Sequence, residues 1–296
     1  MSCFNKYMCL HLVTGLLLVA GCDDAADATP QDRAQAIVAE DASEDASPEK
    51  MAMEQVEQVD APADWRTWVD SEVVRLQSQA PELYNYVRTM EPVETRAGTL
   101  RFSVEEKRDP RMLPLLIDRL THENNSSAVR QALALALTQT GADYSAAAVD
   151  LIGQESDPQV RVVLVQSLRR QAGPQALAGL RAALADTNPE VRLQAVFTAG
   201  SRPDGSTLAA ELLTALDDRD GSVRLEATRT LGALKVEAAK PVLTNLLASP
   251  SPDQRLHALR ALDRIDPVYT AKLGKLADLA TDADPRVVRA VAKLRD

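Results

Sequence analysis

Apolar residues recur along most of the chain at the spacing of one buried helix face. Val223, Ala227 and Leu231, for example, stand four residues apart, and mainly polar residues lie between them. This spacing predicts an amphipathic α-helix. Six segments carry it, starting at residues 126, 157, 188, 220, 251 and 284, and another apolar segment precedes each, at 114–120, 146–152, 176–184, 208–216, 241–247 and 272–280. The pattern predicts six pairs of helices of about ten residues each.

The starts of the second helices are marked by residues that favour helix N-termini. Asp157, Asn188, Asp220 and Asp284 are expected N-caps, and Pro158, Pro189 and Pro285 follow at the first helical position. Between the pairs, the chain is punctuated by Gly141, Gly173, Pro241 and Pro267. Each unit is therefore predicted to be two antiparallel helices.

The units are copies of one another. An Arg stands at the same place in five of them, at spacings of 31, 31, 32 and 31 residues, as Arg130, Arg161, Arg192, Arg224 and Arg255. In the sixth copy this place falls on Val288, with Arg289 one position later. A single helix pair cannot bury its apolar face, whereas a stack of pairs buries these faces jointly. We expect an all-α, right-handed solenoid over residues 109–296.

The repeated pattern Asp-Pro-x-Val-Arg, followed by positions rich in Ala and Leu, resembles the short HEAT repeats of PBS-lyase type. The resemblance implies that the recurring Arg residues form a structural ladder, pairing with Asp or Asn of neighbouring turns and with helix-end carbonyls. Each also has a cap carboxylate or amide in its own repeat. The alternative is a column of cations that binds anions.

Residues 63–108 differ from the repeats. Trp65, Trp68, Val69 and Leu76 make an apolar stripe at helical spacing, and Pro81 is expected to start a second short helix. A solenoid needs a terminal cap over its first open face, and the two Trp side chains suit that role. The alternative is that they anchor a partner. Residues 91–108 are expected to form a loop, with residues 100–104 extended.

The first 22 residues resemble the signal of bacterial lipoproteins. A short apolar run at 10–20 follows Lys6 and ends in LVAGC, similar to a lipobox in which Cys22 is acylated after cleavage. An ordinary cleaved signal peptide is the first alternative and a transmembrane anchor the second. Cys3 and Cys9 would be removed with residues 1–21, which would leave no free thiol. Asp23 and Asp24 resemble an inner-membrane retention signal. The expected location is the bacterial cell envelope, facing the periplasm.

An acidic, weakly hydrophobic segment separates Cys22 from the repeats. Residues 23–62 hold 12 Asp or Glu against Arg33 and Lys50, and residues 63–296 are nearly balanced, with 31 acidic and 30 basic residues. Excess like charge and low hydrophobicity predict a disordered tether over 22–62. The balanced repeat region argues against nucleic acid as a partner.

Catalytic and metal-binding motifs are not evident. His122-Glu123 is one pair of the kind that HEAT-type deoxyhypusine hydroxylase, which the architecture resembles, uses several times to hold iron, whereas His257 precedes Ala258. One pair cannot supply the ligand set. The phycobilin lyases that gave the repeat its name act in the cytoplasm, and an exported chain is not expected there. We predict no catalytic residues, no cofactor and no metal.

The remaining candidate site is a surface. The position five residues after each ladder Arg holds Leu135, Gln166, Phe197, Arg229 and Arg260 in turn. This row changes from apolar to basic, and Arg169, Arg170, His257 and Arg264 lie near it. Such a groove on the concave face suits an amphipathic or acidic peptide, and the acidic tether itself is a further possible occupant. The predicted partner-binding residues are Phe197, Arg229, Arg260, Arg170 and Arg264.

These features together predict a membrane-anchored, non-catalytic scaffold that binds another cell-envelope protein or peptide. Two alternatives stay open. One is a structural spacer or assembly factor in an envelope complex, and the other is a pigment-lyase-like enzyme.

Overall fold

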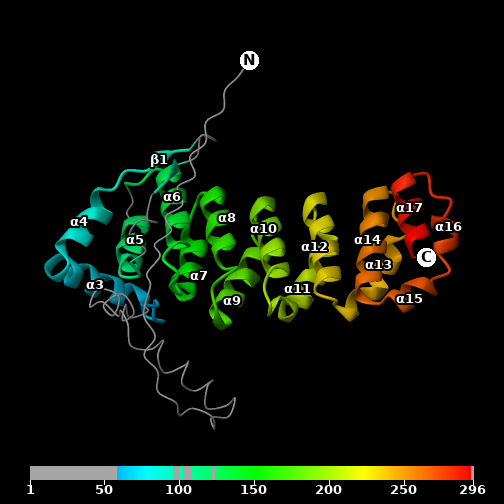
Figure 1. Ribbon diagram of the computed structural model, residues 1–296, viewed down its shortest axis with the longest axis horizontal. Coiled ribbons are helices and arrows are strands. Elements are labelled where there is room, and N and C mark those ends of the chain that lie inside the picture. Colours follow the sequence, from blue (N-terminus) through cyan, green and yellow to red (C-terminus); the bar gives the residue numbers. More distant parts are fainter. Residues whose placement is uncertain (1–58, 96–99, 103–108, 122–123, 295–296) are drawn as a thin grey trace, which may run out of the picture. The chain divides into compact units, whose positions relative to one another are not determined.

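The computed structural model describes residues 59–95, 100–102, 109–121 and 124–294 (Figure 1). The predicted signal segment with Cys22, nearly all of the predicted tether and the pair His122-Glu123 lie outside these residues.

Six helix pairs follow one another from α5 to α17 (Figure 1). The first helices of the pairs are α5 (Met112–Thr121), α7 (Ser145–Gln154), α9 (Gly173–Leu184), α11 (Ala209–Thr214), α13 (Lys240–Leu246) and the divided α15 (Pro267–Ala271) and α16 (Leu276–Leu279). The second helices are α6 (Ser127–Leu137), α8 (Pro158–Ser167), α10 (Pro189–Gly200), α12 (Gly221–Ala233), α14 (Pro252–Ile265) and α17 (Pro285–Lys293). Each second helix packs on the next, and each pair is closed by contacts between its two helices. The fold is an all-α solenoid of HEAT type, as predicted.

The helix pairs share one hydrophobic core. A single cluster of buried apolar side chains runs from Trp65 in the first described helix to Val291 in α17, and most of its members are Leu, Val and Ala. Because these side chains contact the neighbouring pair as well as their own, the buried area of each pair depends on its neighbours. The stack is therefore the unit that folds.

The predicted helix starts are confirmed. The side chains of Asp157, Asn188, Asp220 and Asp284 each accept a hydrogen bond from a backbone N–H in the first turn of their helix. Ser126 and Ser251 do the same for α6 and α14. The repeat thus begins every second helix with a satisfied N-terminus.

The later first helices are more broken than the sequence pattern indicates. Short 3₁₀ turns, η1 (Gly205–Leu208) and η2 (Ala215–Asp217), flank α11, and η3 (Glu237–Ala239) precedes α13. The continuous helix expected at 272–280 is wrong, since α15 ends at Ala271 and α16 starts only at Leu276. Asp266 caps α15 by accepting from the Tyr269 N–H, so the helix begins earlier, and Gly274 disfavours a helix through the gap.

The N-terminal cap consists of α3 (Trp65–Gln79) and α4 (Pro81–Thr89), which pack on α5. Trp65 is only 4% exposed, and its Nε1 donates to Asp150 at 3.0 Å. Trp68 is partly buried against the same core. The burial of Trp65 and its bond to α7 fit the predicted capping role, and Trp65 has almost no surface left to anchor a partner.

A two-stranded antiparallel ribbon follows the cap. It pairs β1 (Val93–Glu94) with β2 (Leu100–Arg101), with Val93 opposite Arg101. The expected loop at 91–108 therefore contains an extended pair.

The last residues of the predicted tether are bound to the stack. The backbone N–H of Ala61 donates to the Asp143 carbonyl at 2.7 Å, and the Asp143 N–H donates to the Asp60 side chain at 2.7 Å. Asp60 and Ala61, which the sequence assigns to the tether, are thus held by two hydrogen bonds to Asp143 just before α7.

Candidate functional site: the arginine ladder and the second-helix face

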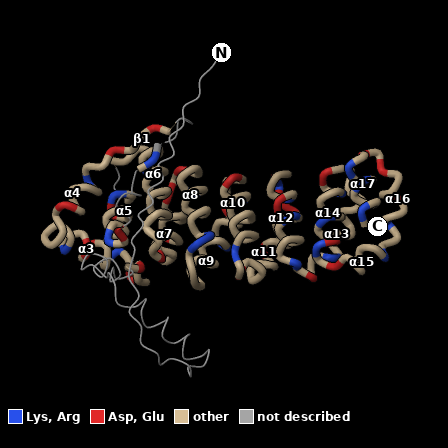
Figure 2. Tube along the Cα trace, in the orientation of Figure 1, with Lys and Arg blue, Asp and Glu red and all other residues tan. Residues whose placement is uncertain are grey.

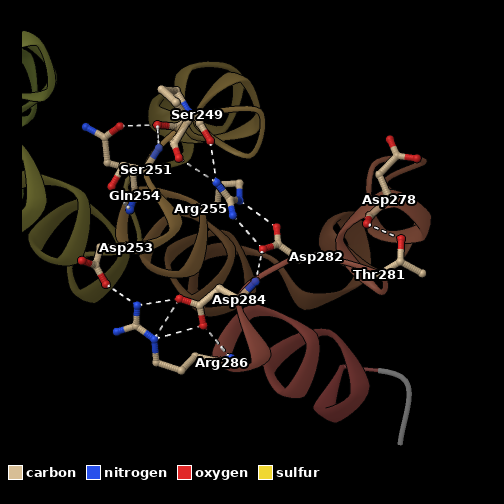
Figure 3. A network of polar contacts seen from close by, with 11 residues as sticks. Ser249, Ser251, Asp253, Gln254, Arg255, Asp278, Thr281, Asp282, Asp284 and Arg286 are labelled. Atoms are coloured by element: carbon tan, nitrogen blue, oxygen red, sulfur yellow. Dashed lines mark hydrogen bonds and ion pairs between the residues drawn. The ribbon is translucent and has the colours of Figure 1, made fainter.

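The five recurring Arg residues lie near the starts of five successive second helices. In four of them, Nε and Nη2 donate to the two oxygens of one carboxylate from the next helix pair, at 2.6–3.0 Å. These four pairs, which we call rungs, are Arg130–Glu155, Arg161–Asp186, Arg192–Asp218 and Arg255–Asp282. Figure 3 shows the last rung. Arg224 pairs with no acid among the described residues.

Each guanidinium also holds the turn before its own helix. The Nη1 of Arg192 donates to the carbonyls of Asp186 and Thr187 at 2.9 and 3.1 Å. The side chains of this rung are 6% exposed for Arg192 and 11% for Asp218. At the four rungs, a carboxylate of the protein already accepts from Nε and Nη2, which form the edge of the guanidinium that an external anion would need. These four Arg residues therefore have a structural role.

The acids of the rungs are not the helix caps. Each stands two residues before a cap and accepts from the backbone N–H of that cap residue, as Asp218 does from Asp220 at 2.8 Å. The caps in the same repeats, which the sequence suggested as partners, accept instead from backbone N–H groups of their own helices. The expected cap carboxylate or amide is wrong for the repeats of Arg130 and Arg255, where Ser126 and Ser251 are the caps. The acids recur 25 to 27 residues after their Arg, and this second periodicity is the signal that would have identified them.

Ion pairing changes the titration of the rung acids. Hydrogen bonds from the Arg192 guanidinium hold the pKa of Asp218 below its ordinary value despite partial burial. Arg255 lowers the pKa of Asp282 in the same way. For Asp186, burial has the largest single effect and would raise the pKa, but the hydrogen bonds from Arg161 and from the Asn188 N–H, together with the charges of Arg161 and Arg192, outweigh it, and the net shift of the pKa is downward. The rung carboxylates are therefore ionised at neutral pH.

The predicted row of surface positions lies at equivalent places on α6, α8, α10, α12 and α14. Leu135 is partly buried, and Gln166, Phe197, Arg229 and Arg260 are exposed. Phe197 is 49% exposed, which is unusual for so large an apolar side chain. We call the surface formed by this row and the residues beside it the second-helix face.

A basic cleft lies at the C-terminal end of this face, between α14 and α17. It has a volume of about 270 Å³, and its walls include Arg260, Arg286, Arg289 and Lys293, with Leu259, Ala290 and Leu294 as apolar lining. Asp263 is the acid among the lining residues. Arg286 is paired with Asp253 and Asp284. Arg260, Arg289 and Lys293 make no ion pair with any residue that the structure describes.

The positive charge around the basic cleft also affects the pKa of the neighbouring His257. Burial lowers the pKa of His257, and the nearby Arg229 and Arg260 lower it further. Arg229 itself makes a 3.2 Å ion pair with Glu226. His257 is therefore neutral near pH 7, and the positive charge here comes from Lys and Arg residues, which Figure 2 colours blue.

The other predicted partner-binding residues lie elsewhere on the stack. Arg170 lines a second cleft of about 210 Å³, together with Leu135, Gln166 and Arg169 of α6, α8 and the turn after α8. Arg264 is exposed one turn beyond Arg260 but is not among the residues that line the basic cleft. The structure thus distributes the five predicted residues along the face, with Phe197 and Arg229 between the two clefts.

Sequence comparison covers the C-terminal part of the stack. Residues 209–294 match the HEAT repeats family. No curated protein matches the chain.

Several solved structures are similar to it. A designed armadillo repeat protein in complex with the peptide (KR)4 is 19% identical, with a TM-score of 0.45 over 62% of this chain and 98% of that one. Computationally designed armadillo repeat proteins for modular peptide recognition are 17% identical, with a TM-score of 0.47 and the same coverage. Human deoxyhypusine hydroxylase in complex with glycerol is 24% identical, with a TM-score of 0.34 over 65% of this chain and 75% of that one.

Within the described residues, no group of three or more His, Cys, Asp or Glu side chains is arranged to hold a metal ion. None of the helices described here combines the length and the apolar character needed to cross a bilayer.

Proposed function

We propose that this protein is a non-catalytic scaffold, tethered to the membrane through Cys22, that binds an acidic or amphipathic segment of another cell-envelope protein on the second-helix face. A repeat solenoid is a fold typical of protein-binding scaffolds, because stacking leaves an extended surface that spans many repeats.

One observation carries the proposal. The basic cleft combines apolar lining from Leu259, Ala290 and Leu294 with three cations, Arg260, Arg289 and Lys293, that have no ion-pair partner among the described residues. In the described part of the chain, by contrast, four of the five ladder Arg residues, all but Arg224, already bind a carboxylate of the protein. An acidic side chain with an apolar neighbour would find both complements in this cleft.

The rest of the face suits an extended or helical segment that continues from the cleft. Arg229 lies near Arg260, since both act on His257, and the exposed Phe197 comes one helix earlier, on α10. Phe and Arg are side chains enriched at interfaces. A bound segment with acidic residues at one end and an apolar residue at the other would match this order.

The first experiment compares two matched double variants of the full chain. Phe197→Ala with Arg260→Glu removes one exposed apolar side chain and reverses one cation on the second-helix face. Val268→Ala with Lys272→Glu makes the same kinds of change on and just after α15, where Val268 is 62% exposed. Each variant is used to capture proteins from solubilised cell envelopes under identical conditions. We expect an envelope protein that the wild type and the α15 variant retain and that the face variant loses at least tenfold.

Both variants should keep the wild-type circular dichroism and melting temperature, since exposed substitutions change stability by only about 0.5 kcal/mol. Equal recovery with the face variant would contradict the proposed surface. Rising salt should weaken the face-dependent capture, because the proposed contacts are charged.

The tether is supported by its length and charge. Residues 23–62 carry a net charge of −10, and a flexible chain of about 40 residues spans roughly 35 Å. Anionic lipid headgroups would repel such a segment, which keeps the stack away from the bilayer and accessible to partners.

Cys22→Ser tests the anchor. The substitution removes the sulfur that would carry the lipid, so we expect the protein to move from the membrane fraction to the soluble fraction and the precursor to stay unprocessed. Fractionation and mass measurement of the N-terminus check this. Cys9→Ser is the matched control and should leave the protein in the membrane fraction. Unchanged membrane association of Cys22→Ser would contradict lipid attachment at this residue.

A further inference from the structure

One ladder arginine has an unused carboxylate-binding edge. The Nη1 of Arg224 donates to the carbonyls of Asp218 and Arg219 at 2.7 and 3.1 Å. The corresponding distances at Arg192 are 2.9 and 3.1 Å, so the guanidinium is held as in a complete rung. No hydrogen bond or ion pair joins Nε or Nη2 of Arg224 to any residue that the structure describes.

The reason is one residue in the next helix pair. The position that supplies the acid, two residues before the N-cap, holds Ser249 before Ser251. Ser249 keeps one of the two contacts of a rung acid, because its Oγ accepts from the Ser251 N–H at 3.2 Å. Its hydroxyl also bonds Gln254 (Figure 3). It brings no carboxylate to Arg224.

The turn around Ser249 is nonetheless placed like the other turns. Arg255 donates through Nη1 to the carbonyls of Ser249 and Pro250 at 2.8 and 3.1 Å, as Arg192 does to the turn before α10. Both sides of the incomplete rung are therefore fixed by contacts that the complete rungs share. What differs is the carboxylate alone.

We propose that Arg224, beside the Ser249–Ser251 turn, is a binding site for a carboxylate supplied from outside the stack. The ligand would accept two parallel hydrogen bonds, from Nε and Nη2, in the geometry that Glu155, Asp186, Asp218 and Asp282 adopt at the other rungs. Bidentate guanidinium–carboxylate pairs combine charge with planar directionality. Because Nη1 already holds Arg224 in place, binding costs little side-chain ordering.

The site is separate from the second-helix face. Arg224 is directed at the turn between the two helices of its own pair, where it contacts residues 218 and 219, whereas the face is formed by positions five residues further along each second helix. Failure of the carboxylate site therefore leaves the proposed scaffold surface unaffected, and the reverse also holds.

The geometry is tested by supplying the carboxylate from within the chain. Ser249→Asp should complete the rung and raise the melting temperature by about 3 °C, the shift that one partly buried ion pair gives in a stack of this size. Ser249→Asn has the same shape without the charge and should give no such rise. In an Arg224→Gln background, Ser249→Asp should also give no rise. A gain that persists without Arg224, or no gain at all, would overturn the assignment.

Binding is tested on the full chain by titrating formate and following the Arg224 Nε–H resonance by NMR, with chloride at the same ionic strength as the control. We expect a saturable shift with a dissociation constant on the order of 10 mM, the affinity that a single bidentate contact supplies. Ser249→Asp, whose own carboxylate fills the edge, should show no shift.

A second titration with the blocked peptide acetyl-Ala-Glu-Ala-amide distinguishes the source of the carboxylate. Saturable shifts with both probes identify the site as one that a protein side chain can enter. A shift with formate alone identifies it as a site for a free small carboxylic acid. If neither probe gives a shift beyond that of chloride, Arg224 binds no carboxylate and the proposal is wrong.

Discussion

Arg192→Ala is expected to lower the free energy of unfolding by about 3–5 kcal/mol, the usual cost of removing one partner from a buried ion pair. The substitution leaves Asp218, whose side chain is 11% exposed, without the guanidinium whose hydrogen bonds lower its pKa. It also frees the carbonyls of Asp186 and Thr187, which have accepted from Nη1. The effect should be large because one side chain connects two successive helix pairs. Urea denaturation followed by circular dichroism at 222 nm measures it.

Arg224→Ala is the matched control for this prediction. Arg224 has the same position in its repeat and the same carbonyl contacts but no acid, so its removal should cost only about 1–2 kcal/mol. The difference between the two variants isolates the carboxylate contact. Equal destabilisation by both would show that the rungs stabilise through their carbonyl contacts alone.

Acid should reduce the difference between the wild type and Arg192→Ala. The pKa of Asp218 is lowered in the folded protein, so the ion pair stabilises the fold above the unfolded pKa of about 4. This contribution is lost as the pH falls through the lower folded pKa. Stability curves of the wild type and Arg192→Ala should therefore converge below about pH 4, and parallel curves down to pH 2 would contradict the assigned role of Asp218.

The second helices could be predicted from the sequence because their signals are local. An N-cap, a Pro at the first helical position and four-residue apolar spacing stand together within about a dozen residues, and each N-cap forms its expected hydrogen bond. Except for α15, which Asp266 caps, the first helices with a described N-cap residue lack a capping side chain. No side-chain cap bond starts α11 or α13, and their packing against neighbours, which the sequence does not display, determines where they break.

The candidate sites were predictable to different degrees. The ladder Arg residues are visible as a period, but their partners lie in turns two residues before the caps, where the sequence also contains other acids such as Asp217 and Asp220. The basic cleft depends on Arg289 and Lys293 of α17 approaching Arg260 of α14, a contact across helix pairs. Arg224 has the same place in its repeat as the other ladder Arg residues, so its Nε and Nη2, free among the described residues, are visible as such only in the structure, by contrast with the four rungs.

Gly205→Ala should destabilise the protein by about 3 kcal/mol or more, at the upper end of the usual effect of overpacking. A Cβ at this position would lie 1.9 Å from the Ala199 carbonyl oxygen and 2.9 Å from its carbon. Both are backbone atoms at the end of α10, and the carbonyl already accepts from the Arg202 N–H at 3.2 Å. No rotation of a flexible side chain can relieve this contact, so the turn between α10 and η1 must move.

Movement of that turn would disturb a buried arginine as well. Arg202 is 5% exposed, and its Nη1 donates to the carbonyls of Leu168 and Gln171 in the preceding helix pair, the latter at 2.6 Å. A shift of α10's end therefore loosens two helix pairs at once, which is the physical reason to expect so large an effect from one methyl group. Backbone amides of residues 199–205 should lose protection from hydrogen exchange in the variant.

Gly153→Ala is the control with the opposite expected sign. Gly153 is exposed near the end of α7, and a Cβ there would meet no atom within 4 Å. Replacing a helical Gly by Ala reduces the freedom of the unfolded chain and should stabilise the protein by about 0.5–1 kcal/mol. Urea denaturation midpoints of both variants and the wild type, measured under the same conditions, give the sign and size of the two stability changes. A Gly205→Ala midpoint at or above that of the wild type would mean that α10 and η1 do not approach each other as closely as the structure places them.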